Sequence, residues 1–124
     1  MNFFPSKVIK ISELAFDYCK NLSNIEIPTD SNLQIIEYFA FSSLNIKEIF
    51  IPSKVSIIPK NAFSKCKYLE KVVIPTNSNF KIIEFRAFYQ TNIDEIYLPA
   101  NLKELKEDWC FEVKQLKKKL QFHL

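Results

Sequence analysis

Glycine is absent from all 124 residues of the chain, and this absence excludes several structures at once. There is no Gly-rich loop of the kind that cradles phosphates in P-loop and dinucleotide-binding proteins. Turn positions that need a positive φ angle, which glycine normally fills, are expected to go to asparagine, aspartate and serine. We expect such positions in two turns of related sequence, residues 30–32 and 77–79.

Histidine and cysteine are also scarce. The only histidine, His123, is one residue from the end, which leaves a Cys-His or Ser-His catalytic pair little support. Cys19, Cys66 and Cys110 are odd in number and form no CxxC pair, which argues against a disulfide framework and a zinc site. We predict that the cysteines are buried free thiols, and that the chain is not an enzyme and has no catalytic residue, metal or cofactor.

Long apolar runs and a strong net charge are missing as well. No run approaches the roughly 18 apolar residues of a membrane helix, and the first residues lack the parts of a secretory signal, so we predict no membrane insertion. The net charge of +3 is too small to indicate nucleic-acid binding. Lysines at 114 and 117–119 could form a phosphate-binding patch or a solvated cap, and we favour the cap.

What the chain does have is a recurring stretch in which two aliphatic residues flank one variable residue and a proline follows. The prolines of this stretch are 24, 23 and 24 residues apart: Pro28, Pro52, Pro75 and Pro99. An Ala-Phe pair lies between them at regular positions: Ala15-Phe16, Ala40-Phe41, Ala62-Phe63 and Ala87-Phe88. A fixed period of this length indicates that the unit of folding is a repeat that buries its apolar face against its neighbours.

The repeats form pairs. Residues 5–51 align with residues 52–98 without a gap and at roughly half identity, which defines a 47-residue double repeat. We predict one solenoid domain over residues 1–124, with about five repeats of 23–24 residues and a divergent last repeat at 99–124. Residues 119–124 could end it as a strand or as a capping helix. We favour the strand, because Phe122 falls 24 residues after Leu98.

Each repeat is expected to have three parts. A short strand ends at the proline, which has no N–H to donate to a neighbouring strand. An apolar segment follows, and then the Ala-Phe turn, which we expect to be one or two turns of helix with the phenylalanine pointing inward. Equivalent strands of successive coils would stack about 4.8 Å apart in a parallel sheet. The predicted fold class is therefore an α/β solenoid, mostly β, with a parallel sheet on one face and short strands and helical turns on the other.

These anchors resemble the BspA-like leucine-rich repeats of bacterial and protist surface proteins. Residues 52–69, PSKVSIIPKNAFSKCKYL, follow the family pattern almost position by position, and so do residues 5–22. The family cysteine becomes Leu44 and Thr91 in alternate repeats. The family glycine before Ala-Phe is replaced at every copy: Ser12, Glu37, Pro59 and Glu84. The resemblance implies a right-handed leucine-rich solenoid, a place at the cell surface, adhesion to host proteins or other cells, and no enzyme activity.

The candidate site lies on the outer face of the strands. Side chains alternate along a strand, so the residue between two buried aliphatic residues points outward. That column is Glu26, Phe50, Val73, Tyr97 and Gln121, and the column before it is Asn24, Glu48, Lys71, Glu95 and Lys119. We predict an apolar ligand-binding patch of Phe50, Val73 and Tyr97. The predicted polar rim is Glu26, Glu48, Lys71 and Glu95. Alternatively, these cross-strand neighbours only stabilise the sheet.

The function that these features indicate is a non-enzymatic protein-binding or adhesion module whose strand face contacts a protein or glycan ligand. Because the chain starts inside a repeat and lacks a leader, a purely structural segment of a longer array is the alternative. A small cytoplasmic scaffold is a further one, consistent with the free cysteines. The exposed ends of the solenoid leave open strand edges, through which copies could self-associate.

Overall fold

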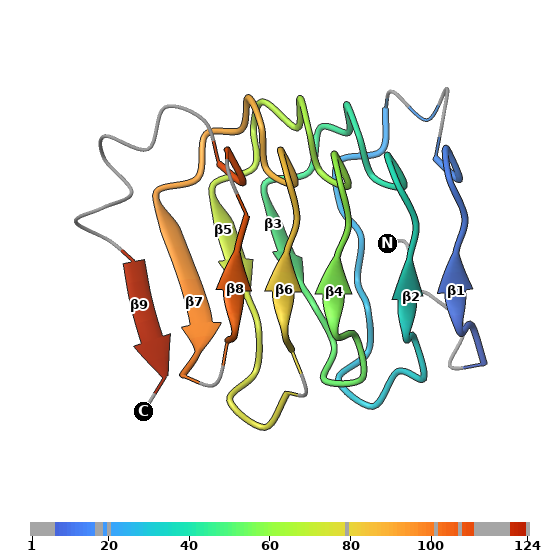
Figure 1. Cartoon of the computed structure of the whole chain (residues 1–124). Coiled ribbons are helices and arrows are strands. Elements are labelled where there is room, and N and C mark those ends of the chain that lie inside the picture. Colours follow the sequence, from blue (N-terminus) through green and yellow to red (C-terminus); the bar gives the residue numbers. More distant parts are fainter. Residues whose placement is uncertain are drawn as a thin grey trace.

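The computed structural model describes residues 7–16, 19, 21–78, 80–100, 102–106, 108–110 and 120–123. These residues form a β-solenoid whose short parallel strands lie in two layers (Figure 1). The first layer is a four-stranded sheet in the order β3-β5-β7-β9. Its strands are β3 (Glu48–Phe50), β5 (Lys71–Val73), β7 (Glu95–Pro99) and β9 (Leu120–His123).

The second layer contains two smaller parallel sheets, β1-β2 and β4-β6-β8. Its strands are β1 (Lys10–Ile11), β2 (Ile35–Ile36), β4 (Ile57–Ile58), β6 (Ile82–Ile83) and β8 (Glu104–Leu105). Apart from β1 and β2, paired strands are not consecutive in the sequence, because the chain forms a strand of the other layer between them. The predicted stack of parallel strands is thus confirmed, as is the final strand, in which Phe122 pairs with Leu98.

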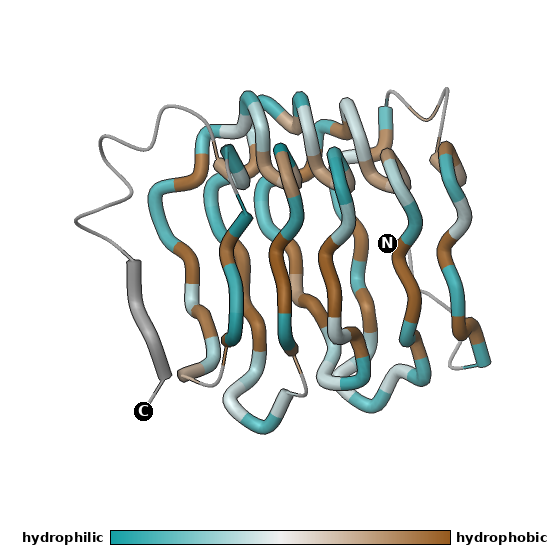
Figure 2. The backbone as a smooth tube through the Cα atoms, viewed as in Figure 1, coloured by the Kyte–Doolittle hydropathy of each residue, from teal (hydrophilic) through white to brown (hydrophobic). Residues whose placement is uncertain are grey.

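The alternation of the repeat explains the core. The aliphatic residues that flank each variable residue are buried between the two layers: Ile25, Ile27, Ile49, Ile51, Val72, Ile74, Ile96 and Leu98. Figure 2 shows hydrophobic residues concentrated along the strands of both layers. A slip by one residue would turn these side chains outward, so the alternation fixes the register, which pairs Ile49 with Val72 and Val72 with Ile96.

Each proline both ends a strand and opens a turn. Its ring removes the N–H that a further ladder bond would need, but its carbonyl oxygen still accepts a bond. The N–H three residues on donates to that oxygen at 3.0–3.2 Å after Pro28, Pro52, Pro75 and Pro99. In two of these turns a buried serine hydroxyl then accepts the N–H two residues later, from Leu33 to Ser31 and from Phe80 to Ser78.

The predicted helical turns at the Ala-Phe pairs are wrong, since no helix occurs in the part of the chain that the structure describes. An α-helix directs successive N–H groups to carbonyls four residues back. Here alternate N–H groups donate instead to a carbonyl three residues back and to the next coil. Ala62 donates to Pro59 at 3.2 Å, whereas Phe63 donates to Ala87 at 2.8 Å and Lys65 to Tyr89 at 2.7 Å. The turn is therefore a corner of the solenoid that continues the ladder between coils.

The left-handed positions also differ from the prediction. They lie at the corners, and none lies in the described parts of the turns at 30–32 and 77–79. Successive corners each place two of them four residues apart, as at Asn61 (φ 58°) and Lys65 (φ 62°). Across the described chain they are Leu14, Phe39, Ser43, Asn61, Lys65, Arg86, Gln90 and Asp108. Three of them, Ser43, Asn61 and Asp108, are of the expected residue types, whereas leucine, phenylalanine, lysine, arginine and glutamine occupy the other five.

The corner phenylalanines point inward, as predicted, and stack in a column that runs through the coils. Ring centroids are 5.3 Å apart for Phe16 and Phe41, 4.8 Å for Phe41 and Phe63, and 5.2 Å for Phe63 and Phe88. Trp109 ends the column edge-on, with its centroid 6.3 Å from that of Phe88. The column links adjacent coils along the stack at the corner.

The cysteines differ in burial. Cys66 and Cys110 are buried free thiols, as predicted, whereas Cys19 is exposed, and the prediction is wrong there. The thiol of Cys66 reaches the preceding coil and donates to the carbonyl of Phe41 at 3.0 Å. Among the described residues no coil precedes that of Cys19, so no described carbonyl of a preceding coil accepts a bond from this thiol. Desolvation raises the pKa of the Cys66 thiol to about 12 and that of Cys110 to about 11.

Candidate functional site

The structure brings the predicted apolar residues together on the outer face of the first layer. Phe50 of β3 pairs with Val73 of β5, which pairs with Tyr97 of β7. All three side chains are half-buried, and residues paired in this way on neighbouring strands are close enough for their side chains to interact. Tyr97 pairs in turn with Gln121 of β9, so the backbone register extends to the last strand.

The second predicted column is in register too. Glu48 pairs with Lys71, and Lys71 pairs with Glu95, so opposite charges face each other across neighbouring strands. Glu48 is exposed, while Lys71 and Glu95 are half-buried. Lys119 lies outside the described residues. Alternating charges of this kind support the sheet and also provide polar groups beside the apolar column.

Contacts at Tyr97 join the two columns. Its hydroxyl donates a hydrogen bond to Oε1 of Glu95, and the Lys71 ammonium lies 5.9 Å from the centroid of its ring. The bond to Glu95 is the main reason that the pKa of Tyr97 is raised, followed by desolvation and by the charge of that carboxylate. The tyrosine is thereby held on the sheet with a fixed direction, which suits a residue that is to contact a ligand without a large loss of entropy.

Glu26 lies at the open side of the column. It borders a hollow of about 490 Å³ together with Asn24, Thr29, Glu48, Phe50, Lys71 and Val73. Glu26 is half-buried, and its backbone forms an isolated β-bridge of one residue, whereas β3 is a strand of three residues. The hollow therefore gives access to one side of the Phe50 ring.

The rim of this face carries more negative charge than the predicted alternation of acidic and basic residues would give it. A second hollow, of about 530 Å³, is lined by Ser23, Asn24, Lys47, Glu48, Glu70, Lys71, Asp94 and Glu95. Four carboxylates thus face two ammonium groups. Glu70 and Asp94 were not among the predicted site residues, since they precede the regular alternation of their strands. The face favours a ligand that carries basic groups at its margin.

The second layer contains a hollow that the sequence analysis did not predict. Ile35 and Ile57 point outward from β2 and β4 and border a hollow of about 620 Å³. The sequence could have indicated it, because three strands of this layer each contain two consecutive isoleucines: Ile35-Ile36, Ile57-Ile58 and Ile82-Ile83. Alternate residues of a strand point to opposite faces, so one isoleucine of each pair must face outward.

Metal binding and membrane spanning find no support in the described residues. They contain no group of three or more histidine, cysteine, aspartate and glutamate side chains that could hold a metal ion. In the same part of the chain, no helix has the length and apolar character needed to cross a membrane.

Two layers of short parallel strands, joined by proline turns and corner phenylalanines, define a leucine-rich-repeat β-solenoid. The family model of the BspA type leucine rich repeat region matches residues 2–117 in six copies. The chain belongs to this BspA-type leucine-rich-repeat family, as the resemblance of its anchor residues indicated.

A solved structure agrees with the fold. The crystal structure of a leucine rich cell surface protein from Faecalibacterium prausnitzii A2-165 superposes with a TM-score of 0.58 at 23% sequence identity. The match covers 86% of this chain and 34% of that protein, so this chain spans about a third of its length. None of the curated proteins compared with the chain matches it significantly. The likeness to the crystal structure is one of fold.

Proposed function

We propose that the chain is a binding module that presents the outer face of β3, β5 and β7 to a protein ligand at the cell surface. The observation that carries the proposal is the in-register column of Phe50, Val73 and Tyr97 with charged residues beside it. Aromatic residues with a polar margin are typical of the energetic centre of protein interfaces. Membership of the BspA-type family supports this function, and the surface protein of similar fold supports the location.

The geometry favours an extended or flat ligand surface over a small molecule. The hollows on this face are shallow grooves between coils, and the side chains that border them come from successive strands. A protein segment that crosses the strands would bury the Phe50 and Tyr97 rings and place basic groups near Glu48, Glu70 and Asp94. The module would act without catalysis, by holding its partner.

The test compares the wild-type protein with a Phe50→Ser/Tyr97→Ser double variant in pull-downs from host-cell surface extracts. We expect partners retained by the wild type to be lost by the variant, with at least a thirtyfold weaker affinity, since each aromatic hot spot contributes about 2 kcal/mol. The circular dichroism spectrum should remain that of a β-solenoid. An Ile9→Ser/Tyr68→Ser variant, which changes two exposed apolar side chains that border none of the hollows described above, is the matched control and should retain the partners.

Two outcomes would contradict the proposal. If the double variant captures the same partners as the wild type, this face does not bind them. If neither protein captures a partner, the result contradicts the binding function and favours the alternative of a structural segment. Fractionation of the source cells tests the location, because recovery in the cytosolic fraction would contradict the surface assignment.

A further inference from the structure

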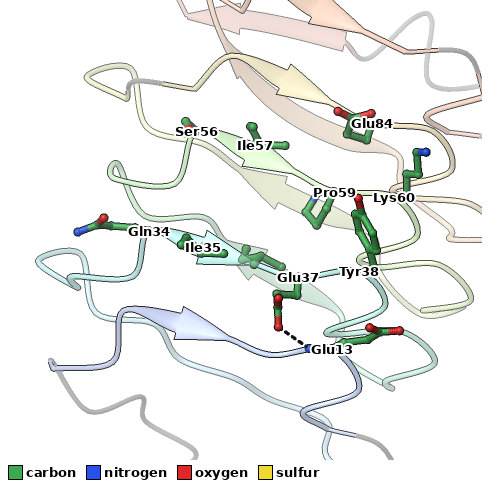
Figure 3. Close-up of a pocket in the computed structure, with 11 residues that line it drawn as sticks. Glu13, Gln34, Ile35, Glu37, Tyr38, Ser56, Ile57, Pro59, Lys60 and Glu84 are labelled. Atoms are coloured by element: carbon green, nitrogen blue, oxygen red, sulfur yellow. Dashed lines mark hydrogen bonds between the residues drawn. The ribbon is translucent and has the colours of Figure 1, made fainter.

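The second layer has its own outward apolar surface, separate from the proposed binding face. Ile35 is 49% exposed and Ile57 is 40% exposed, although both belong to strands whose next residue is fully buried. They lie side by side in Figure 3, on the neighbouring strands β2 and β4. The hollow that they border, of about 620 Å³, falls in the size range of pockets that bind ligands, about 300–1,000 Å³.

The hollow lies over a break in the sheet. Within the described residues, no backbone hydrogen bond joins β2 to β4, whereas β1 pairs with β2 and β4 with β6. In the other coils, one backbone hydrogen bond between coils (a rung of the ladder) comes from the residue three places before the corner alanine. The N–H of Glu37 donates to the carbonyl of Ile11, and that of Glu84 to the carbonyl of Ile58. Pro59 occupies that place in the third coil and has no N–H to give. Pro59 therefore accounts for the absence of this rung. A second rung, which Lys81 and Ile82 make to Ser56, has no counterpart from Ser56 and Ile57 to β2, and the proline does not account for that one.

The lining changes in character along the hollow. Gln34 and Ser56 are at one end, and Ile35, Ile57 and Pro59 form an apolar middle. At the other end Tyr38, which is 53% exposed, lies near three carboxylates and one ammonium group: Glu13, Glu37, Glu84 and Lys60. An apolar middle beside an acidic and aromatic end gives the hollow a direction.

Two of the three carboxylates form no ion pair within the described part of the chain, although Lys106 is close enough to Glu84 for the two charges to interact. Glu37 forms an ion pair with Lys10 at 3.5 Å and accepts the N–H of Glu13 at 3.2 Å. No ion pair joins the side chain of Glu13 or Glu84 to a described residue. The charge at this end is therefore negative, which repels acidic peptides and anionic lipid surfaces and attracts cations.

We propose that this hollow docks an extended segment of a partner protein in which a lysine or arginine follows an aliphatic residue. The aliphatic side chain would cover Ile35 and Ile57. The basic group would lie beside Tyr38, where the aromatic face and the carboxylates of Glu13 and Glu84 both favour a cation. A wholly apolar ligand would remove water from these carboxylates without pairing them, which is unfavourable.

The probe is the peptide acetyl-Ser-Lys-Leu-Lys-Ser-amide, added up to 5 mM to the ¹⁵N-labelled chain and followed by amide chemical shifts. We expect saturable shifts at the amides of Ile35, Ile57, Tyr38 and Glu84. The same peptide with glutamate in place of lysine should produce no shifts. A Glu13→Gln/Glu84→Gln variant, which keeps the shape of two surface side chains, should bind the lysine peptide at least fivefold more weakly. Glu48→Gln/Glu70→Gln on the other layer is the matched control and should bind normally.

Several results would overturn this proposal. They are an absence of shifts at 5 mM, shifts confined to β3, β5 and β7, or shifts that the Glu13/Glu84 variant leaves unchanged. If concentrating the protein alone produces the same shifts, the occupant is a second copy and not a separate partner. The Phe50→Ser/Tyr97→Ser variant should bind the peptide normally, so this test and the test of the proposed function can fail independently.

Discussion

Individual corner residues are held in a backbone conformation that their side chains disfavour. A left-handed residue with a Cβ atom costs about 1–2 kcal/mol, because Cβ approaches the following carbonyl oxygen. Glycine would avoid this cost, but the chain has none. Phe39 and Lys65 instead adopt φ angles of 58° and 62°. The coil packing on both sides of the corner must be strong enough to hold them there.

Replacing Lys65 with glycine is expected to stabilise the protein. The side chain is exposed, and the N–H that donates to Tyr89 remains in the variant. Relief of the left-handed strain should exceed the added entropy of the unfolded chain, so the free energy of unfolding in urea should rise by about 1 kcal/mol. Lys67→Gly is the control, since Lys67 is exposed but is not among the residues with positive φ. It should leave stability unchanged or lower it, and equal effects at both positions would contradict the explanation.

The buried thiol of Cys66 makes stability depend on pH in the alkaline range. Its pKa is about 12 in the folded protein, against an ordinary value of 9.0. The folded state therefore keeps a proton that the unfolded state loses, so the stabilisation is complete below pH 9 and disappears as the pH rises towards 12. The three pKa units between these values correspond to a loss on the order of 4 kcal/mol.

Urea denaturation at a series of pH values would measure this loss. Cys66→Ala should be less stable at neutral pH, because it leaves a cavity, but should lose less stability between pH 9 and 12. Parallel pH profiles for the wild type and the variant would contradict the role of the Cys66 thiol.

The burial of the cysteines also predicts their reactivity. In the folded wild type, Cys19 should react with a thiol reagent while Cys66 and Cys110 stay protected, since Cys19 is exposed and the other two are buried.

At the scale of the elements, the strands were predictable and the corners were not. The alternation of Ile49 and Ile51 around Phe50 fixes which side chains are buried, and the period places equivalent strands side by side. The corners were predicted as helix because Ala-Phe segments of this length suit a helical turn. Five of their eight left-handed residues (Leu14, Phe39, Lys65, Arg86 and Gln90) are of types that seldom adopt positive φ, so local composition did not indicate these positions. The contacts between coils impose that conformation.

The candidate site on the first layer was predictable from the alternation and period that predict the strands. The hollow on the second layer was not. The in-register pairs from Phe50 to Tyr97 follow from alternation and period. The hollow on the second layer is bordered by Pro59, which replaces the family glycine before Ala62-Phe63. Its effect comes from the N–H that it lacks toward a strand 23 residues earlier, which local patterns do not reveal.

Phe63 is expected to be the most sensitive member of the phenylalanine column. It is fully buried, and its ring stacks between those of Phe41 and Phe88. Phe63→Ala should lower the free energy of unfolding by about 3–5 kcal/mol, the range for a large cavity in a core. Phe16 is half-buried and has one described ring neighbour, so Phe16→Ala should have less than half this effect. Denaturation in urea measures the free energy of unfolding of both variants. Equal losses would show that a ring stacked on both sides contributes no more than a ring with one described neighbour.

Pro59→Glu tests the cause of the break between β2 and β4. Glutamate occupies the equivalent place at Glu37 and Glu84, where its N–H donates to the preceding coil. The new N–H should donate to Ile36, and its amide should exchange slowly with solvent. The gain of a hydrogen bond, about 1 kcal/mol, and the loss of proline rigidity nearly cancel, so stability should change by less than about 1 kcal/mol. Fast exchange at residue 59 would mean that something other than the proline separates the strands.

At the scale of the whole molecule, the solenoid is a one-dimensional stack. Each coil contacts the coils beside it, so the stability of a coil depends on how many neighbours it has. Phe63 and Lys65 donate to the next coil, while the carbonyls of the same corner, from Ala62 and Ser64, accept bonds from Phe41 and Ser43 in the preceding coil. The first described strand, β1, pairs with β2 only. Central and terminal coils should therefore open with different free energies.

Native-state hydrogen exchange tests this expectation on the chain as it is. Amides that bond between central coils, such as those of Phe63 and Lys65, should exchange only through global unfolding. The amides of Gln34 and Glu37, which hold β2 to the first coil, should exchange through a local opening that is lower by at least about 1 kcal/mol. A Phe63→Ala substitution should lower the protection of both groups, because the central coils support the ends, whereas Phe16→Ala should affect the first coil alone. If every inter-coil amide shows the same free energy in the wild type and in Phe16→Ala, the coils unfold as one unit and nearest-neighbour coupling does not limit their stability.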